Sequence, residues 1–324
     1  MMINLKITAR SIYDELTARD IDVQIMRLAH TQALVFDYRG RPRVIIGANP
    51  DVSSASASVI AQAKHLTYAM LQRYPVATMP ASELYIDGER AKEFLDVHKR
   101  IVTKPVDGAH GNGVTINITN PEQLDAAVAV AKEHSGSGAV MMQQQVSGVD
   151  LRVLIIDGEC IGAVRREPAS VTGDGAHTIN ELVARENSHN DDRGDTPYTK
   201  KLNKIDVEAV MRYLSQEQRD YIPREGEICC VVGTANIGTG GRSIECRDMI
   251  PQEIIDEALA VAGLSGAFIC GVDFLYDESQ GTWCLIEINA SPSFGLHMMP
   301  SEGHAIMDLP KLYVDKLLAK YNQG

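Results

Sequence analysis

Apolar residues recur along the chain at two spacings, which predict helices and strands respectively. Spacings of three and four residues predict helices over residues 11–19, 61–74, 89–97, 122–134, 251–263 and 308–320. Short apolar runs bounded by turn-forming residues predict strands near residues 34–36, 44–46, 100–104, 114–118, 139–143, 150–156, 160–166, 228–232, 268–276 and 282–289. Helices and strands are mixed along the whole chain, so the pattern predicts an α+β fold.

One long polar segment interrupts this pattern. Residues 186–204 hold one Tyr and one Leu among charged and other polar side chains. A structureless loop of this length inside a compact domain is typically functional or disordered. Two interpretations stay open, a mobile cover over an active site and a plain solvated insertion.

Composition and charge narrow the class of protein. The 324 residues include 31 Lys and Arg against 43 Asp and Glu, a net charge of −12, which argues against generic binding to nucleic acid or an anionic membrane. No apolar run approaches the roughly 18 residues of a membrane helix, and the charged N-terminus lacks a signal core. The six Cys show no C-x-x-C spacing and are interpreted as reduced thiols. We expect a cytoplasmic enzyme or binding protein, with the oligomeric state left open, a homodimer included.

Several common catalytic motifs are missing from the sequence. It contains neither the P-loop pattern G-x-x-x-x-G-K-[ST] nor the dinucleotide pattern G-x-G-x-x-G. The zinc-protease pattern H-E-x-x-H and the hydrolase pattern G-x-S-x-G are also missing. If the protein binds a nucleotide, it must therefore use a different phosphate-binding site.

Residues 271–289 carry the most informative pattern, two apolar runs around a polar loop that predict a hairpin. A turn centred near Gln280 places Asp273 opposite Glu287, with Cβ atoms about 5 Å apart, and Asn289 on the same face. Facing carboxylates repel unless a cation lies between them, and these oxygen donors suit Mg²⁺. The alternative is a solvated acidic face.

A glycine-rich turn follows the predicted strand that ends at Lys104. Its glycines lie at positions 108, 111 and 113, where they let the backbone aim N–H groups at an anion while Lys104 adds a positive charge. The alternative is an ordinary hairpin loop. Lys64 lies on the predicted helix 61–74, where an exposed lysine is the ordinary interpretation. Residues 141–150 form a connecting strand that could offer backbone groups to an adenine edge.

Taken in order, these runs resemble the ATP-grasp superfamily of carboxylate–amine ligases. The resemblance is strongest to the ATP-grasp region of cyanophycin synthetase and of bifunctional glutathione synthetase. It is carried by residues 63–67 (AKHLT), 104–114 (KPVDGAHGNGV), 148–154 (GVDLRVL), 166–179 (REPASVTGDGAHTI), 235–241 (ANIGTGG) and 287–292 (EINASP). It runs from about residue 53 to the C-terminus, and the first 50 residues match no family by motif.

The resemblance implies an ATP-grasp fold, in which two α+β subdomains grip ATP, preceded by a short N-terminal α/β segment. The implied division is an N-terminal segment with a leading helix over 1–75, a small subdomain with the phosphate loop over 76–146, and a large catalytic subdomain over 147–324. It also implies ATP and two Mg²⁺ ions as cofactors, with Mn²⁺ as an alternative.

The resemblance also implies a role for each matching position. The ATP-binding positions are Lys64, Lys104, Gly108, Gly111 and Gly113 for the phosphates, Gln143 and Val146 for adenine, and Asp150 for ribose. The metal ligands are Asp273, Glu287 and Asn289. The catalytic set, which stabilises the acyl phosphate and the oxyanion that follows, is Arg166, Asn289 and the backbone at Ser293. The positions near the substrate carboxylate are Arg152, Asn236, Gly240, Gly241 and Arg242.

The sequence departs from the usual family pattern at four places. Ala63 stands where Asp is usual, and residues 143–145 are all Gln where relatives usually carry a Glu. Ser293 replaces a common Gly, and Arg242 replaces a small or neutral residue. Backbone contacts to adenine would survive the second change, whereas the last would reshape substrate choice.

The resemblance implies a two-step reaction in which a carboxylate attacks the γ-phosphate of ATP and an amine then attacks the acyl phosphate. Because the flanking domains of both relatives are missing here, we expect a free-standing enzyme that joins an amino acid to an amino-acid or peptide carboxylate. Glutathione synthesis from γ-glutamylcysteine and glycine is the alternative. A nucleotide-binding regulator without catalysis is a third hypothesis, which the intact Asp273, Glu287 and Asn289 set disfavours.

Overall fold

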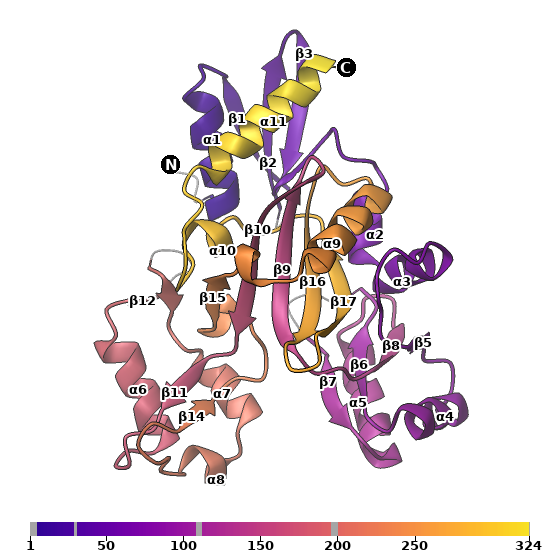
Figure 1. Cartoon of the computed structure of the whole chain (residues 1–324), viewed down its shortest axis with the longest axis vertical. Coiled ribbons are helices and arrows are strands. Elements are labelled where there is room, and N and C mark those ends of the chain that lie inside the picture. Colours follow the sequence, from indigo (N-terminus) through magenta and orange to yellow (C-terminus); the bar gives the residue numbers. More distant parts are fainter. Residues whose placement is uncertain (1–4, 29–30, 108–111, 196–199, 324) are drawn as a thin grey trace.

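A five-stranded antiparallel sheet forms the centre of the computed structural model, which describes residues 5–28, 31–107, 112–195 and 200–323 (Figure 1). Its strand order is β15-β10-β9-β16-β17. The strands are β9 (Val149–Ile156), β10 (Glu159–Glu167), β15 (Arg242–Glu245), β16 (Ile269–Asp277) and β17 (Thr282–Asn289). Two lobes extend from one end of this sheet, and the N-terminal sheet lies at the other end.

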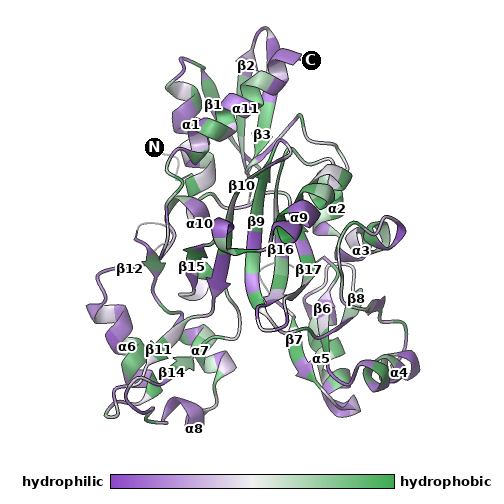
Figure 2. Ribbon diagram, in the orientation of Figure 1, coloured by the Kyte–Doolittle hydropathy of each residue, from purple (hydrophilic) through white to green (hydrophobic). Residues whose placement is uncertain are grey.

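Alternating side chains give the two faces of the central sheet different roles. On β9, Leu151, Val153 and Ile155 pack beneath helix α9 (Gln252–Ser265). On the opposite face, Leu154 and Ile156 join the N-terminal core, whereas Asp150 and Arg152 lie farther along the strand. Figure 2 shows the matching change on β10 from hydrophobic to hydrophilic toward its C-terminal end. One end of this face is therefore a polar site on an otherwise apolar sheet.

The lobe of residues 82–144 is a four-stranded sheet covered by two helices. The strand order is β5-β8-β6-β7. The strands are β5 (Ser82–Leu84), β6 (Ile101–Pro105), β7 (Thr115–Ile118) and β8 (Val140–Gln144), and the helices are α4 (Gly88–His98) and α5 (Pro121–Glu133). Asp87 and Asn120 cap the helix N-termini through their side-chain oxygens. This lobe follows the predicted elements closely.

The predicted continuous helix over 61–74 is wrong, because α2 (Ala57–Gln62) and α3 (Lys64–Arg73) are separate helices. Ala63 between them has φ −98° and ψ 86°, outside the helical region. The Lys64 N–H donates to the Val106 carbonyl at 3.3 Å, which turns the start of α3 toward the end of β6. The break places Lys64 in the first turn of a helix.

The second lobe contains β11 (Ser170–Thr172), α6 (Ile179–His189), α7 (Val207–Tyr213), α8 (Gln216–Arg219) and β14 (Ile228–Cys230). The expected structureless loop over 186–204 is wrong in its described part. Helix α6, started by a capping box at Thr178 and Glu181, continues to His189. The strands β12 (Arg193–Gly194) and β13 (Leu202–Asn203) then pair in parallel. Short 3-10 helices η1 (Ile237–Thr239) and η2 (Arg247–Met249) flank β15.

The N-terminal sheet packs against the C-terminal helix. The order is β1 (Val23–Leu28), β2 (Thr31–Tyr38), β3 (Arg41–Ile46) and β4 (Asn49–Pro50), and the helices are α1 (Ile7–Thr17) and α11 (Leu309–Gln323). Its core includes Phe36, Phe294 and Tyr313, so both chain ends contribute to one cluster. In the part of the chain that the structure describes, no helix combines the length and apolar character needed to cross a bilayer.

Candidate active site

Two arginines and two aspartates form an ion cluster on the polar end of the central sheet. Arg152 donates from Nε and Nη2 to the two oxygens of Asp273, both at 2.6 Å. Arg166 donates from Nη2 to Asp273 at 2.9 Å and from Nε to Asp150 at 2.7 Å. The strand register explains the grouping, since Asp273 is paired with Arg152 and Arg166 with Asp150.

The cluster balances its own charge. Burial alone would raise the pKa of Asp273, but Arg152 and Arg166 outweigh it and hold that pKa below its usual range. Burial alone would lower the pKa of Arg152, which the Asp273 carboxylate raises instead. Burial raises the pKa of Asp150 to about 6, with Arg166 opposing the rise. Sequence reasoning placed Arg152 near a substrate carboxylate, and the structure places it against Asp273.

The acidic hairpin has the predicted cross-strand pair. Asp273 is the register partner of Glu287, and Asn289 lies opposite Gly271. A bulge between Asp273 and Phe274 leaves Ile286 as the additional residue of β17. The Asn289 side-chain oxygen accepts the Ser291 N–H at 3.0 Å. The hairpin therefore presents a carboxylate and an amide oxygen beside the ion cluster.

The donors at this hairpin fit a magnesium ion that also binds phosphate, and they do not form an all-protein cage. Both oxygens of Asp273 are engaged by guanidinium groups. Within the described ranges, there is no group of three or more His, Cys, Asp or Glu side chains that could hold a metal ion. Glu287 and Asn289 supply hard oxygen ligands, and Mg²⁺ usually takes one or two carboxylates together with phosphate oxygens. The metal roles stay a prediction.

The two predicted phosphate-binding lysines lie near Glu287. Lys104, at the end of β6, is only 5% exposed, and its Nζ donates to the Gln143 Oε1 at 2.8 Å. Burial lowers the pKa of Lys104 to about 8, while Glu287 raises it and Lys64 lowers it further. The Lys64 Nζ lies 3.6 Å from Glu287, and its side chain is only 13% exposed, so it is not an ordinary exposed lysine.

Sequence reasoning missed Tyr68, which connects these elements. Its buried hydroxyl accepts a hydrogen bond from the Gln143 side chain and lies 3.4 Å from the Leu285 carbonyl of β17. The sequence could have indicated this role, because Tyr68 follows Lys64 by four residues on α3 and the two side chains therefore share one helix face. Tyr68 thus joins α3, the small lobe and the hairpin.

The two predicted adenine contacts lie in different settings. Gln143 is buried in β8 with register partners on both sides, Ser82 and Val102, and its side chain is used within the protein. Val146 lies beyond the end of β8, half-buried in the connection to β9. Backbone recognition by Val146 and ribose recognition by Asp150 stay predictions.

Of the phosphate-loop glycines, Gly108 and Gly111 lie outside the described residues. Gly113 has φ +73°, and a Cβ there would lie 2.6 Å from the His134 Cβ. Only glycine fits this position without strain. At the start of the loop, the Asp107 carboxylate accepts the Ser135 hydroxyl at 2.7 Å and the Ser137 N–H at 2.9 Å.

Apart from Arg152 on β9, the predicted substrate residues lie on the edge strand β15 and in the turn before it. Arg242 is the register partner of Glu167, next to Arg166, and its side chain forms an ion pair with Glu302. The N–H groups of Gly238, Gly240 and Gly241 all donate within the turn, the first to the Asn236 side chain and the others to backbone carbonyls. Their backbone is therefore used to shape the turn.

The segment around Ser293 lies beside the ion cluster and is bonded to helix α1 and to the turn between β3 and β4. A Cβ on Gly271 would lie 3.0 Å from the Arg152 side chain and 3.3 Å from Pro292, which places this segment close to Arg152. The Ser291 hydroxyl oxygen accepts the Ala48 N–H at 2.9 Å. The Phe294 N–H donates to the Thr8 hydroxyl at 3.0 Å.

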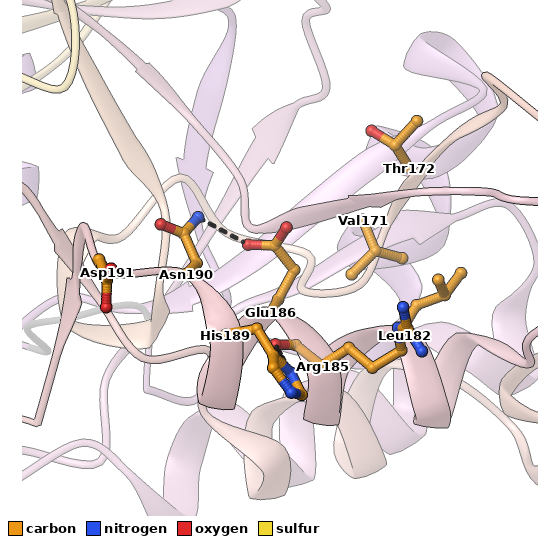
Figure 3. A pocket seen from close by; sticks show the side chains of 8 residues that line it. All are labelled: Val171, Thr172, Leu182, Arg185, Glu186, His189, Asn190 and Asp191. Carbon is orange, nitrogen blue, oxygen red and sulfur yellow. Dashed lines mark hydrogen bonds between the residues drawn. The ribbon is translucent and has the colours of Figure 1, made fainter.

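A pocket of about 440 Å³ lies away from these groups, beside α6 (Figure 3). It is lined by Val171, Thr172, Leu182, Arg185, Glu186, His189, Asn190 and Asp191. None of the predicted site residues lines it. The grouped charges of the ion cluster and the lysines, and not the pocket, therefore define the candidate site.

Comparison with known proteins gives a consistent result. Residues 68–193 match the family model described as prokaryotic glutathione synthetase, ATP-grasp domain. Cyanophycin synthetase of Geminocystis herdmanii is 34% identical over 229 residues, which cover 68% of this chain and 26% of that protein. The bifunctional glutathione biosynthesis protein GshAB of Listeria monocytogenes is 27% identical over 311 residues, 93% of this chain and 40% of that protein.

The structural comparison covers nearly the whole chain. The crystal structure of a bifunctional glutathione synthetase from Pasteurella multocida superimposes with a TM-score of 0.68 at 25% identity. The match covers 98% of this chain and 44% of that chain. This chain therefore spans less than half the length of these relatives.

Proposed function

Since this chain contains an ATP-grasp domain of the kind found in prokaryotic glutathione synthetase, we propose that the protein is an ATP-dependent carboxylate–amine ligase. The predicted ATP-grasp fold is confirmed. The cytoplasmic location stays a prediction.

One observation carries the proposal, the position of Glu287 between the ion cluster and the two lysines. Glu287 is the register partner of Asp273 in the ion cluster and lies 3.6 Å from the Lys64 Nζ. Its charge also acts on Lys104. The acidic hairpin, Lys64 and Lys104 therefore lie close together, which supports binding of a single nucleoside triphosphate.

In this proposal Lys64 and Lys104 bind the phosphates of ATP, and Glu287 and Asn289 hold Mg²⁺ together with phosphate oxygens. When bound, the ions, two in number, neutralise charge on the transferring phosphoryl group, and Mn²⁺ could replace them. A substrate carboxylate oxygen bonds to the γ-phosphorus as the bond to ADP breaks. The amine nitrogen then bonds to the acyl carbon, phosphate leaves, and the amine proton passes to solvent.

Arg166 and the backbone N–H near Ser293 stabilise the negative charge that develops in the second step. Arg166 is suited to this task because Asp150 and Asp273 already fix its guanidinium group. Asp150 thus positions Arg166 in addition to its predicted contact with ribose. The protein mainly supplies orientation and charge, as phosphoryl transfer requires.

We propose an amino acid or peptide as the acid and an amino acid as the amine. Similarity to both cyanophycin synthetase and glutathione synthetase supports this class of substrates. Glutathione synthesis from γ-glutamylcysteine and glycine is the second candidate, which the glutathione synthetase domain match favours. A nucleotide-binding regulator without catalysis is the third.

The test measures ADP release from Mg-ATP with a panel of amino acids and dipeptides, including γ-glutamylcysteine with glycine. Products are identified by mass spectrometry. We expect ADP release that depends on both an acid and an amine, with one condensed product for each ADP. ATP binding without ADP formation under every pair would instead support the regulator.

A further inference from the structure

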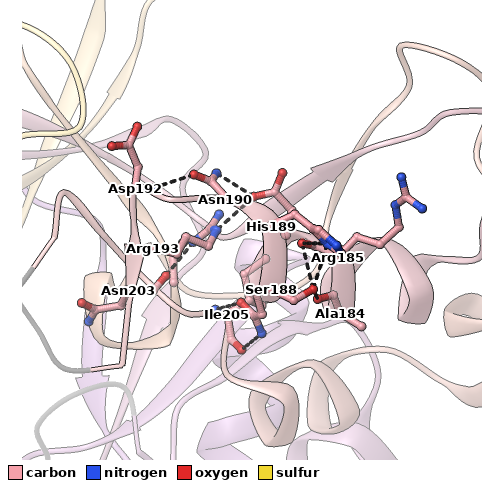
Figure 4. A network of polar contacts seen from close by, with 12 residues as sticks. Ala184, Arg185, Ser188, His189, Asn190, Asp192, Arg193, Asn203 and Ile205 are labelled. Atoms are coloured by element: carbon pink, nitrogen blue, oxygen red, sulfur yellow. Dashed lines mark hydrogen bonds and ion pairs between the residues drawn. The ribbon is translucent and has the colours of Figure 1, made fainter.

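One buried arginine outside the predicted site joins three separate segments of the second lobe. Arg193 is only 6% exposed. Its Nε donates to the Glu186 carboxylate of α6 at 3.0 Å, and its Nη1 donates to the Asn203 carbonyl of β13 at 2.6 Å and the Gly240 carbonyl at 3.2 Å (Figure 4). A buried guanidinium group needs such partners, so Arg193 fixes the separation of all three segments.

The turn that contains Gly240 rests directly on the segment after β13. Gly240 has φ +95°, and a Cβ there would lie 2.7 Å from the Ile205 Cα. The Asp206 N–H donates to the Thr239 carbonyl at 3.3 Å. The backbone of the turn therefore follows the position of residues 203–206, which Arg193 holds.

The other side of the same turn contacts the candidate active site. A Cβ on Gly241 would lie 2.7 Å from the Glu167 carbonyl, so the turn packs against the end of β10. In the β10–β15 pairing, Arg242 is opposite Glu167 and Ser243 is opposite Arg166. A shift of the turn therefore moves Arg242 and the edge of the sheet beside Arg166.

We infer that Arg193 is a positioning residue for the acid substrate, acting through the 236–241 turn. This inference rests on the proposed function, because the substrate role of Asn236 and Arg242 belongs to that proposal. Arg193 has no direct contact with Lys64 or Lys104 among the described hydrogen bonds. Loss of its side chain should therefore weaken binding of the acid substrate and leave nucleotide binding nearly unchanged.

Asn187 offers a matched control within the same network. Its side chain donates to the Ile205 carbonyl at 2.9 Å and accepts the Ile205 N–H at 2.7 Å. It thus ties the same segment to α6 without a described bond to the turn. Both residues stabilise the lobe, but Arg193 alone of the two bonds to Gly240.

The kinetic test compares Arg193→Met, Arg193→Lys and Asn187→Ala in the full chain. The acid is the most active one in the panel above, with γ-glutamylcysteine and glycine assayed in every case. For Arg193→Met we expect KM for the acid to rise roughly tenfold or more, and KM for ATP to stay within about twofold. Arg193→Lys, which keeps the charge, should fall between this variant and the wild type.

Asn187→Ala should lower the melting temperature, and KM for the acid should rise by less than in Arg193→Met, because Asn187 acts on the turn only through Ile205. An equal rise in acid KM for Asn187→Ala and Arg193→Met would overturn the inference, because it would show a general effect of lobe stability. A rise in KM for ATP as large as that for the acid would also overturn it.

Hydrogen exchange in the ligand-free protein separates this inference from the proposed function. Peptides over 236–241 should exchange faster in Arg193→Met than in Asn187→Ala or the wild type. Unchanged exchange in Arg193→Met contradicts the positioning role. If the wild-type protein releases no ADP with any pair, the proposed function fails, and the exchange result still decides whether Arg193 holds the turn.

Discussion

The guanidinium end and the lysine end of the candidate site differ in how their charge is balanced. At the guanidinium end, Arg152 and Arg166 are bound by the carboxylates of Asp273 and Asp150. At the lysine end, the buried Lys104 amine donates to the neutral Gln143 side chain. The first end is neutral by itself, whereas the second contains a buried cation with a neutral hydrogen-bond partner.

The pKa values follow the same division. Neighbouring opposite charges favour the ionised forms of Asp273 and Arg152 despite burial. Burial disfavours the ionised form of Lys104 and lowers its pKa to about 8. A bound anion would therefore stabilise the charged form of Lys104 at the lysine end. At the guanidinium end, the aspartates already fix the arginine side chains before any ligand binds.

The largest expected effect comes from breaking the guanidinium end with Asp273→Asn. This change removes the carboxylate that neutralises two arginines, one of them buried, and should lower the free energy of unfolding by about 3–5 kcal/mol. Urea denaturation measures the loss. Asp277→Asn, at the half-buried end of the same strand, where the carboxylate accepts hydrogen bonds from the following turn, serves as control and should cost less. Equal losses in the two variants would mean that the cluster does not stabilise the sheet.

The next effect concerns the residue between the two ends. Glu287→Gln keeps the shape of the side chain and removes the charge that faces Lys64, so turnover should fall by about 100-fold or more while the fold is retained. Steady-state ADP release and circular dichroism measure the two properties. Glu278→Gln in the adjacent loop is the matched control, and turnover of Glu287→Gln equal to that of this control would reject the metal assignment.

The smallest effect is a pH dependence at the lysine end. Phosphate favours the charged amine, and Lys104 in the ligand-free protein loses its proton above about pH 8. ATP affinity should therefore be fully present below pH 8 and fall as the pH rises, by about tenfold between pH 7 and pH 9. Calorimetric titration of Mg-ATP measures this profile.

Lys104→Arg provides the control for the pH profile, since a guanidinium group stays charged throughout this range. In that variant the affinity should change little between pH 7 and pH 9. The same decline in both proteins would assign it to another group.

The acidic hairpin shows how far a sequence pattern can reach. Alternation in β16 and β17 predicted that Asp273 faces Glu287, which is confirmed. The loop pairs Asp277 with Thr282, so a regular ladder would have placed Ile286 opposite Asp273. The bulge at Ile286 restores the predicted pair. The predicted pair was therefore correct, although the loop is centred between Ser279 and Gln280 and not on Gln280. No pattern in the sequence indicated the bulge.

Contacts between distant segments account for what the sequence did not predict. Residues 186–204 have a polar composition typical of a loop, yet Arg193 is buried, and its guanidinium group donates to the Asn203 carbonyl within this segment and to the distant Gly240 carbonyl. The break at Ala63 similarly depends on the Val106 carbonyl, far along the chain. The ATP-grasp fold followed from ordered motifs, whereas these features depend on partners that local patterns do not specify.

Hydrogen bonds to Thr8 of α1 and from Ala48 in the turn between β3 and β4 connect the N-terminal region to the segment around Ser293. This part of the chain carries no motif of its own, yet its contacts help to fix the position of that segment. Changes that loosen the contacts of Thr8 and Ala48 should therefore shift the backbone near Ser293, whose catalytic role is a prediction.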